Sequence, residues 1–122
     1  ALVLPFIPYL VDQVKSSARK RGYITTFAGR RCRFLDDNAS LHAAINRLIQ
    51  GSAADQTKIA MLKLWDEHSL VPHVSMHDEL CYSVPDERFG HEVVGKSMET
   101  AVPLEVSSRV DVEVGDNWGQ AS

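Results

Sequence analysis

Cysteine is scarce in this sequence, since Cys32 and Cys81 are the only two among 122 residues. They lie far apart, with neither the spacing of metal ligands nor the density of a disulfide-stapled secreted domain. The sequence therefore predicts reduced thiols in a cytosol-like compartment. With 44% hydrophobic and 24% charged residues the composition is that of an ordinary globular protein, and the length suits one domain or less.

Long hydrophobic runs are also missing. The apolar N-terminal run, residues 1–10, contains Pro5 and Pro8, is too short to span a bilayer and lacks the basic start of a signal peptide. We therefore expect no membrane segment. The chain begins with Ala1 rather than Met, so we expect a piece of a longer chain or a processed product.

Acidic residues are rare in the first half of the chain. Residues 1–63 hold ten Lys/Arg and four Asp/Glu, whereas residues 64–122 hold three and twelve, so the net charges are +6 and −9. No acid interrupts the seven basic residues of the stretch 15–33, which are Lys15, Arg19, Lys20, Arg21, Arg30, Arg31 and Arg33. Such a patch is typical of polyanion-binding proteins. A solvated helix face followed by a charged turn explains the charges equally well.

Apolar residues at helical spacing predict two long helices. The first covers Phe6–Arg21 and ends at Gly22. The second covers about residues 41–67, and Asn38 or Ser40 is suited to cap its start.

Strand signals accompany these helices. Two short strands are expected at residues 23–27 and 32–34, and a last strand at residues 106–114. A third helix is expected over residues 86–102, just before the last strand. The order of elements predicts an α+β fold in which helices cover one antiparallel sheet.

The most informative stretch covers residues 74–84. Apolar residues alternate on both sides of His77, Asp78 and Glu79, which predicts two half-buried strands joined as a hairpin with these three residues at its tip. Adjacent carboxylates suit a hard divalent cation. An exposed turn also accounts for them, because Asp is a common turn residue.

Three neutral polar residues are spaced by four in the long helix. His42, Asn46 and Gln50 therefore share one face, one turn apart. Amide donors in a column can contact the acceptors that every base pair presents in the minor groove, whatever the sequence. A solvent-facing polar stripe is the other interpretation. The small residues 51–54 follow, and they admit the close approach of a backbone or ligand or mark a kink.

Four motifs in order resemble the C-terminal part of family A DNA polymerases, the DNA polymerase I type of bacteria, phages and organelles. They are GYITT with GRR at residues 22–31, AIN with IQGSAAD at 44–55, HDEL at 77–80 and NWG at 117–119. The resemblance covers nearly the whole chain, from about residue 5 to residue 122. It implies a palm-type antiparallel sheet with an acid-tipped hairpin packed against helices, including one long helix.

The resemblance also implies roles for single residues at the reacting centre. Asp78 matches the palm carboxylate that binds two catalytic Mg²⁺ ions, and Glu79 matches a secondary acid at that metal site. His77 matches a residue that touches the primer 3′ end.

Further matches fall on residues that contact DNA. Asn46 and Gln50 match residues that contact the nascent base pair or the primer–template minor groove. Arg30 and Arg31 fall in the turn of the family pattern, where a contact with the template or primer backbone is expected. His42 departs from the pattern, because bacterial enzymes carry Arg at the similar position.

Residues from about 1 to 40 would then be a fingers-side helix and β-turn, and residues from about 41 to 122 a palm with the catalytic hairpin. The implied activity is transfer of a nucleotidyl group from a dNTP to a primer 3′-hydroxyl by two-metal catalysis. The implied partners are primer–template DNA, dNTP and the N-terminal polymerase part, in the same chain or as a separate subunit. The expected location is the cytoplasm of a bacterium or phage-infected cell, or an organelle.

The same resemblance predicts that this chain alone is inactive. A second metal-binding Asp and a fingers helix with Lys, Arg and Tyr are expected upstream, and Asp36, Asp37 and Asp55 are badly placed substitutes. A stand-alone nucleic-acid-binding module and a metal-dependent nuclease built on the acidic hairpin are the competing hypotheses.

Overall fold

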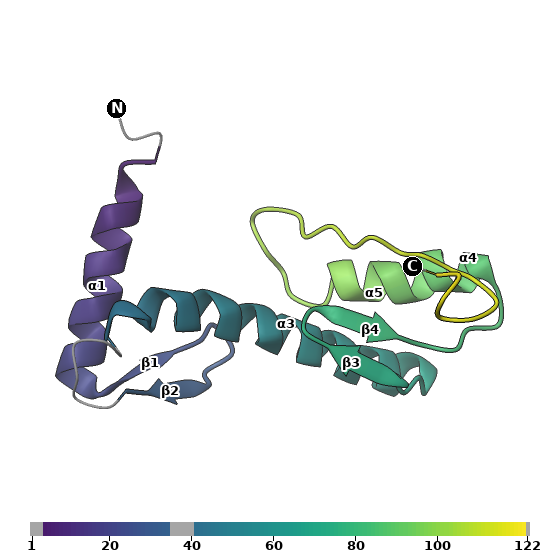
Figure 1. Ribbon diagram of the computed structural model, residues 1–122, viewed down its shortest axis with the longest axis horizontal. Coiled ribbons are helices and arrows are strands. Elements are labelled where there is room, and N and C mark those ends of the chain that lie inside the picture. Colours follow the sequence, from purple (N-terminus) through teal and green to yellow (C-terminus); the bar gives the residue numbers. More distant parts are fainter. Residues whose placement is uncertain (1–3, 35–40, 122) are drawn as a thin grey trace. The chain divides into compact units, whose positions relative to one another are not determined.

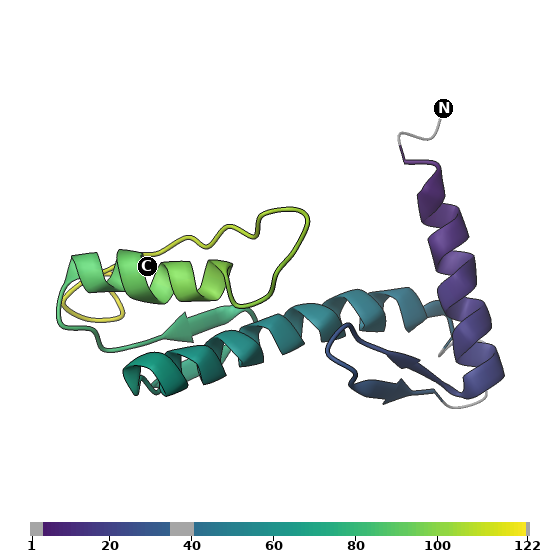
Figure 2. The same ribbon diagram turned by 180° about the vertical axis from the view of Figure 1, so that it is seen from behind.

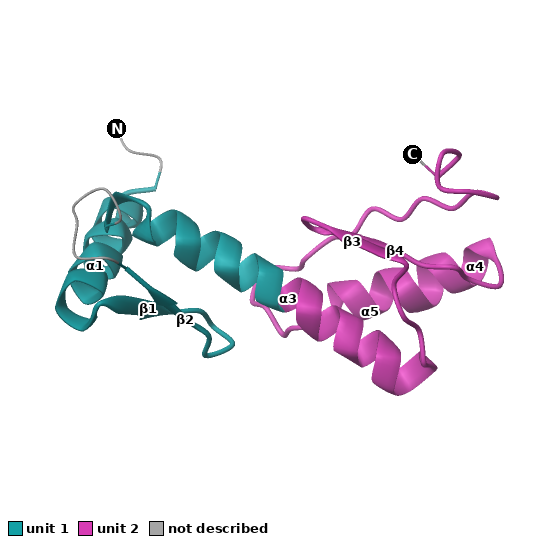
Figure 3. Cartoon of the chain, turned by 60° about the horizontal axis from the view of Figure 1, so that its bottom comes forward, with its two compact units in different colours: residues 1–55 teal, residues 56–122 magenta. Residues whose placement is uncertain are grey.

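The computed structural model describes residues 4–34 and 41–121 (Figure 1). The chain divides into two compact units, residues 1–55 and 56–122 (Figure 3). The long helix α3 (Ala44–His68) contributes its first half to unit 1 and its second half to unit 2. The caps expected at Asn38 and Ser40 lie outside the described residues.

Unit 1 begins with the helix α1 (Phe6–Arg21), as the sequence predicted. Gly22 ends the helix in the left-handed conformation, with φ 73°, and its N–H donates to the carbonyl oxygen of Ala18. The chain then forms the antiparallel strands β1 (Tyr23–Thr25) and β2 (Arg31–Arg33). This confirms the strand pair predicted from residues 23–34.

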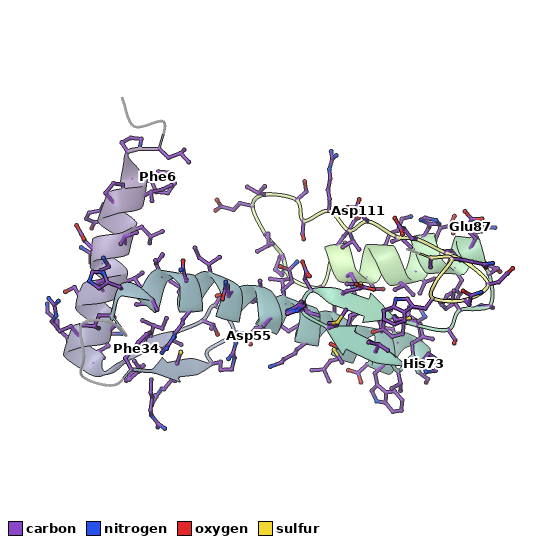
Figure 4. The ribbon with its side chains drawn as sticks, in the orientation of Figure 1. Phe6, Phe34, Asp55, His73, Glu87 and Asp111 are labelled. Carbon is purple, nitrogen blue, oxygen red and sulfur yellow. The ribbon has the colours of Figure 1, made fainter. Side chains whose placement is uncertain are left out.

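The core of unit 1 lies where α1, β1 and the start of α3 meet. Its buried side chains come from all three segments and from Leu41, three residues before α3: Val14, Ala18, Ile24, Leu41 and Ala44. Phe34 packs partly against this core and also lies under the guanidinium of Arg47, 5.0 Å from its ring centroid (Figure 4). Burial of these apolar side chains is the main source of stability for unit 1.

Unit 2 combines the second half of α3 with a hairpin and a compound helix. The hairpin pairs β3 (Val74–Met76) with β4 (Glu79–Cys81). The compound helix consists of α4 (Glu87–Phe89), the π-helical turn η1 (Gly90–Gly95) and α5 (Lys96–Glu99). The buried residues of unit 2 come from α3, from the compound helix and from the segment after it: Ala60, Leu64, Gly90, Val94, Gly95, Ser97 and Val102.

Polar contacts tie the compound helix to the rest of unit 2. The carboxylate of Asp86 accepts a hydrogen bond from the N–H of Phe89, 2.8 Å away, and so caps the helix start. The ring of His68, at the end of α3, meets Phe89 edge-on at 6.1 Å. Lys63 donates from Nζ to the hydroxyl of Thr100 at 2.9 Å.

Three sequence predictions for unit 2 need correction. The helix predicted over residues 86–102 is interrupted by η1 and ends at Glu99. The two strands of the hairpin differ, because β3 is exposed along its whole length whereas β4 is half-buried in part. The described residues form two separate two-stranded antiparallel sheets, where the sequence predicted one sheet. The α+β class itself is confirmed.

The strand predicted at residues 106–114 was wrong. This segment is extended but pairs with no strand of the described chain. Figures 1 and 2 show this segment running along the compound helix. Val112 and Val114 lie close to Gly95 and Gly90 of that helix. A Cβ on Gly95 would lie 2.7 Å from Cγ2 of Val112, so only glycine permits this contact. Val112 and Val114 thus face a helix and not a sheet.

Across residues 4–34 and 41–121, no helix has both the length and the apolar character needed to cross a membrane.

Tyr82 lies just after β4, and its buried hydroxyl group gives a stability prediction for unit 2. Its hydroxyl oxygen is buried and has no hydrogen-bond partner among the described residues. A buried polar group without a partner costs about 1–3 kcal/mol. Tyr82→Phe should therefore keep or raise the free energy of unfolding at pH 7, measured by urea titration. Tyr9→Phe is the control because Tyr9 is exposed, and a clear loss of stability in Tyr82→Phe alone would contradict the burial.

The same residue predicts a pH dependence. Burial raises the pKa of the Tyr82 phenol above its ordinary value of 10.0. Above pH 10 the unfolded chain therefore loses this proton first, and the free energy of unfolding of the wild type falls until the pH passes the folded-state pKa. Urea titrations at pH 9 and pH 11 should show a smaller alkaline loss in Tyr82→Phe than in Tyr9→Phe.

Candidate metal and nucleic-acid sites

The acidic hairpin turns within two residues. Met76 pairs with Glu79, so His77 and Asp78 form the turn, and Glu79 is the first residue of β4. The structure thus confirms the hairpin but places Glu79 in the strand beside the tip. His77 has φ 53°. Two-residue hairpin turns require positive φ at the first central position, and His is one of the side chains that tolerate it.

All three residues at or beside the turn, His77, Asp78 and Glu79, are exposed. No group of three or more His, Cys, Asp or Glu side chains among the described residues is placed to hold a metal ion. The acids at or beside the turn are Asp78 and Glu79, which are too few to form a complete metal site by themselves. Mg²⁺ is commonly bound through one or two carboxylates together with substrate phosphates. Asp78 and Glu79 are therefore candidate ligands of a site that would need further ligands.

The predicted polar column falls on two segments. Asn46 and Gln50 lie on α3, one turn apart and exposed. His42 is also exposed and lies in the helical residues 41–42, which the turn residue Ala43 separates from α3. Asn46 and Gln50 therefore share one face of α3, and His42 lies two residues before that helix.

The basic patch is partly engaged in contacts within unit 1. Arg19, Lys20 and Arg21 occupy the last turn of α1, where cations interact favourably with the helix dipole. The guanidinium of Arg31 lies over the ring of Tyr23, 4.9 Å from its centroid. Part of the patch thus has the local structural role that the charge pattern left open.

Arg30 is held by two acceptors on α3. Its Nε donates to Oδ1 of Asp55 at 2.7 Å, and its Nη2 donates to the carbonyl oxygen of Gly51 at 2.8 Å. The hydroxyl of Thr26 donates to the second carboxylate oxygen of Asp55 at 2.5 Å. The β1–β2 turn is therefore fastened to α3 through one carboxylate.

Asp55 is the residue that sequence reasoning missed. Its helical position ruled it out as a metal ligand, yet it is 5% exposed and joins two residues of the β1–β2 turn. Figure 4 shows it on α3 beside that turn. The signal was present in the small residues 51–54, because a Cβ on Gly51 would lie only 3.1 Å from Cγ2 of Thr26. The close approach expected there is made by the turn.

The chain is similar to known proteins along nearly its whole length. The chain matches DNA polymerase family A over residues 4–120. It is 44% identical to a DNA-directed DNA polymerase of Pseudomonas phage M6, over 97% of this chain and 18% of that protein. It is 37% identical to the thermostable DNA polymerase I of Thermus filiformis, over 96% of this chain and 16% of that protein.

A solved structure has the same fold. The POL domain of an M. smegmatis protein, in complex with DNA primer-template and dNTP, aligns with a TM-score of 0.80 and 33% identity. The alignment covers 93% of this chain and 23% of that one. The chain therefore belongs to DNA polymerase family A. It spans less than a fifth of the length of the two curated relatives named above.

The close contact at Gly51 gives a stability prediction. Thr26 and Arg30 are both fixed by Asp55, so they cannot move away from a new methyl group. Gly51→Ala should lower the free energy of unfolding by about 1 kcal/mol, because overpacking costs about 1–3 kcal/mol and exceeds the gain in helix propensity of about 1 kcal/mol.

The matched control uses Thr26→Ser, which removes the methyl group and keeps the hydroxyl. In that background the loss caused by Gly51→Ala should shrink, as measured by urea unfolding of the four variants in a double-mutant cycle. An equal loss in both backgrounds would show that the Thr26 methyl group does not limit this site.

Proposed function

We propose that this chain is the C-terminal portion of a larger DNA polymerase and carries part of its catalytic centre. The reaction is template-directed transfer of a nucleotidyl group from a dNTP to a primer 3′-hydroxyl. The observation that carries the proposal is an exposed Asp78 in the turn of a hairpin, in a chain of DNA polymerase family A. The M. smegmatis relative, solved with DNA primer-template and dNTP, supports the same partners here.

Asp78 and Glu79 are the residues that would hold Mg²⁺. Two bound ions would supply electrostatic stabilisation of the attacking and leaving oxygens of the displacement. Asp78 is the primary ligand because it occupies the turn itself, whereas Glu79 is held in the ladder opposite Met76. His77 would contact the 3′ end of the primer from the neighbouring turn position.

Asn46 and Gln50 would contact the primer–template minor groove. Both amides are exposed on one face of α3, where their N–H groups can donate to purine N3 or pyrimidine O2. Because every base pair presents such acceptors, these contacts test pair geometry without reading sequence. Arg30 and Arg31 would contact the DNA backbone from the β1–β2 turn.

The assignment of residues 1–40 to a fingers side and 41–122 to the palm is part of this proposal. The proposed boundary between fingers side and palm lies near residue 40, whereas the compact units divide after Asp55. The two divisions differ because α3 contributes to both units. The partners are primer–template DNA, dNTP and the N-terminal polymerase part. The phage and bacterial relatives support a cytoplasmic location in a bacterium or phage-infected cell.

Replacing the turn carboxylate tests the catalytic role directly. In the enzyme reconstituted with its N-terminal part, Asp78→Asn should slow single-nucleotide incorporation by about 10³-fold or more, because a catalytic metal supplies several kcal/mol and each 1.4 kcal/mol is tenfold. Binding of primer–template DNA should change little.

The matched control is Asp111→Asn, which removes one exposed carboxylate from another part of unit 2 and should leave incorporation unchanged. Full incorporation by Asp78→Asn would remove the metal-ligand assignment. DNA binding without any synthesis by the reconstituted wild type would favour a stand-alone nucleic-acid-binding module. Mg²⁺-dependent cleavage of labelled DNA would favour a nuclease.

The isolated chain should not extend a primer. Its described residues offer two adjacent carboxylates and no group of three metal-binding side chains, so the rest of the metal site must come from elsewhere. A primer-extension assay with Mg²⁺ or Mn²⁺ should therefore show no product until the N-terminal part is added. Metal-dependent extension by this chain alone, lost in Asp78→Asn, would refute this expectation.

A further inference from the structure

The Arg30 side chain is held by hydrogen bonds and is also exposed to solvent. The proposed contact with the DNA backbone does not by itself explain this combination. Two of its N–H groups are bound, one by the Asp55 carboxylate and one by the Gly51 carbonyl oxygen. Its side chain is nevertheless 47% exposed. A guanidinium has five N–H donors, so three remain for another acceptor beyond the contacts of the described residues.

The carboxylate that holds Arg30 is itself fixed. Asp55 is 5% exposed and Thr26 is 4% exposed, and the Thr26 hydroxyl donates to the carboxylate oxygen that Arg30 leaves free. Two hydrogen bonds from the backbone also connect Thr26 and Arg30. The N–H of Arg30 donates to the Thr26 hydroxyl oxygen at 3.2 Å, and the N–H of Thr26 donates to the Arg30 carbonyl oxygen at 2.9 Å. Asp55 therefore orients the guanidinium through a rigid group.

We propose that Asp55 is a positioning residue that presents Arg30, already oriented, to a DNA backbone phosphate next to the base pair contacted by Gln50. Gly51, which accepts the Nη2 hydrogen bond, directly follows Gln50 in α3. The phosphate-binding donors and the minor-groove amide are thus fixed to the same turn of the helix. This inference rests on the proposed function.

Preorganisation is the physical benefit. A free arginine on the surface loses side-chain entropy when it binds a phosphate, whereas Arg30 has lost most of that freedom on folding. Its planar fork matches a phosphate, and the residual donors keep a fixed direction. The cost is that a buried acid neutralises part of the arginine's charge. Arg30 would therefore contribute through direction and hydrogen bonding more than through long-range attraction.

The test measures the dissociation constant for primer–template DNA over a series of salt concentrations in the complete polymerase. Arg30→Gln should weaken binding by about tenfold and reduce the slope of log K against log salt by about 1, because one phosphate contact is lost. Arg88→Gln is the charge-matched control, since Arg88 lies in α4 and is exposed, and it should leave both quantities unchanged.

Asp55→Asn separates positioning from charge. Removing an acid near DNA should strengthen binding if only net charge matters. If Asp55 positions Arg30, the variant should instead bind about threefold to tenfold more weakly with an unchanged salt slope, because orienting the freed side chain now costs entropy. In the double variant, affinity and slope should equal those of Arg30→Gln alone.

Thr26→Val, which removes only the hydroxyl that holds the second carboxylate oxygen, should weaken binding in the same direction and decides the matter if Asp55→Asn does not fold. Stronger binding by either variant, or additive effects in the double variant, would overturn the positioning role. An unchanged salt slope in Arg30→Gln would overturn the phosphate contact. Failure of the wild-type enzyme to bind primer–template DNA would overturn the proposed function instead.

Discussion

The buried carboxylate of Asp55 is the constraint on which unit 1 depends. A carboxylate removed from water must be compensated by hydrogen bonds or an opposite charge, and Asp55 receives both from Thr26 and Arg30. Because these partners lie 25 to 29 residues earlier in the chain, satisfying one side chain fixes the β1–β2 turn against α3. The glycine at position 51 follows from this constraint, since a side chain there would meet Thr26 and Arg30 of the turn.

In unit 2, a close approach between two segments depends on apolar contacts. Gly90 and Gly95 open the surface of the compound helix, and Val114 and Val112 occupy the space that their missing side chains leave. The C-terminal segment is therefore held against a helix while β3 stays exposed. An exposed hairpin would be a liability in a closed domain, because unpaired strand edges invite pairing with other chains. It is a reasonable arrangement for the proposed C-terminal portion of a larger polymerase.

How far the sequence predicted these features depends on the range of the interactions involved. Gly22 and the hairpin turn are set by neighbouring residues, so their signals are local. The end of α1 and the hairpin were predicted correctly, although the predicted tip included Glu79, which belongs to β4. The alternation of valines in residues 106–114 is local too, but it looks the same whether the valines face a sheet or glycines on a helix. The role of Asp55 is set by residues across the unit, and the hint of it in the sequence was the run of small residues 51–54 just before it. Interactions between distant residues, and patterns that fit two structures equally well, account for the errors.

Asp55 differs from Asp78 and Glu79 in the origin of its compensating charge. Asp55 has its cation within the chain, because Arg30 contacts it directly, and a metal ion would have to displace that contact. Asp78 and Glu79 are exposed, and neither forms an ion pair within the described parts of the chain. Adjacent anions of this kind repel one another and any approaching phosphate, and a divalent cation relieves both effects at once. A carboxylate with an internal cation therefore serves the structure, while an acid pair without one is the place to expect a cation from outside.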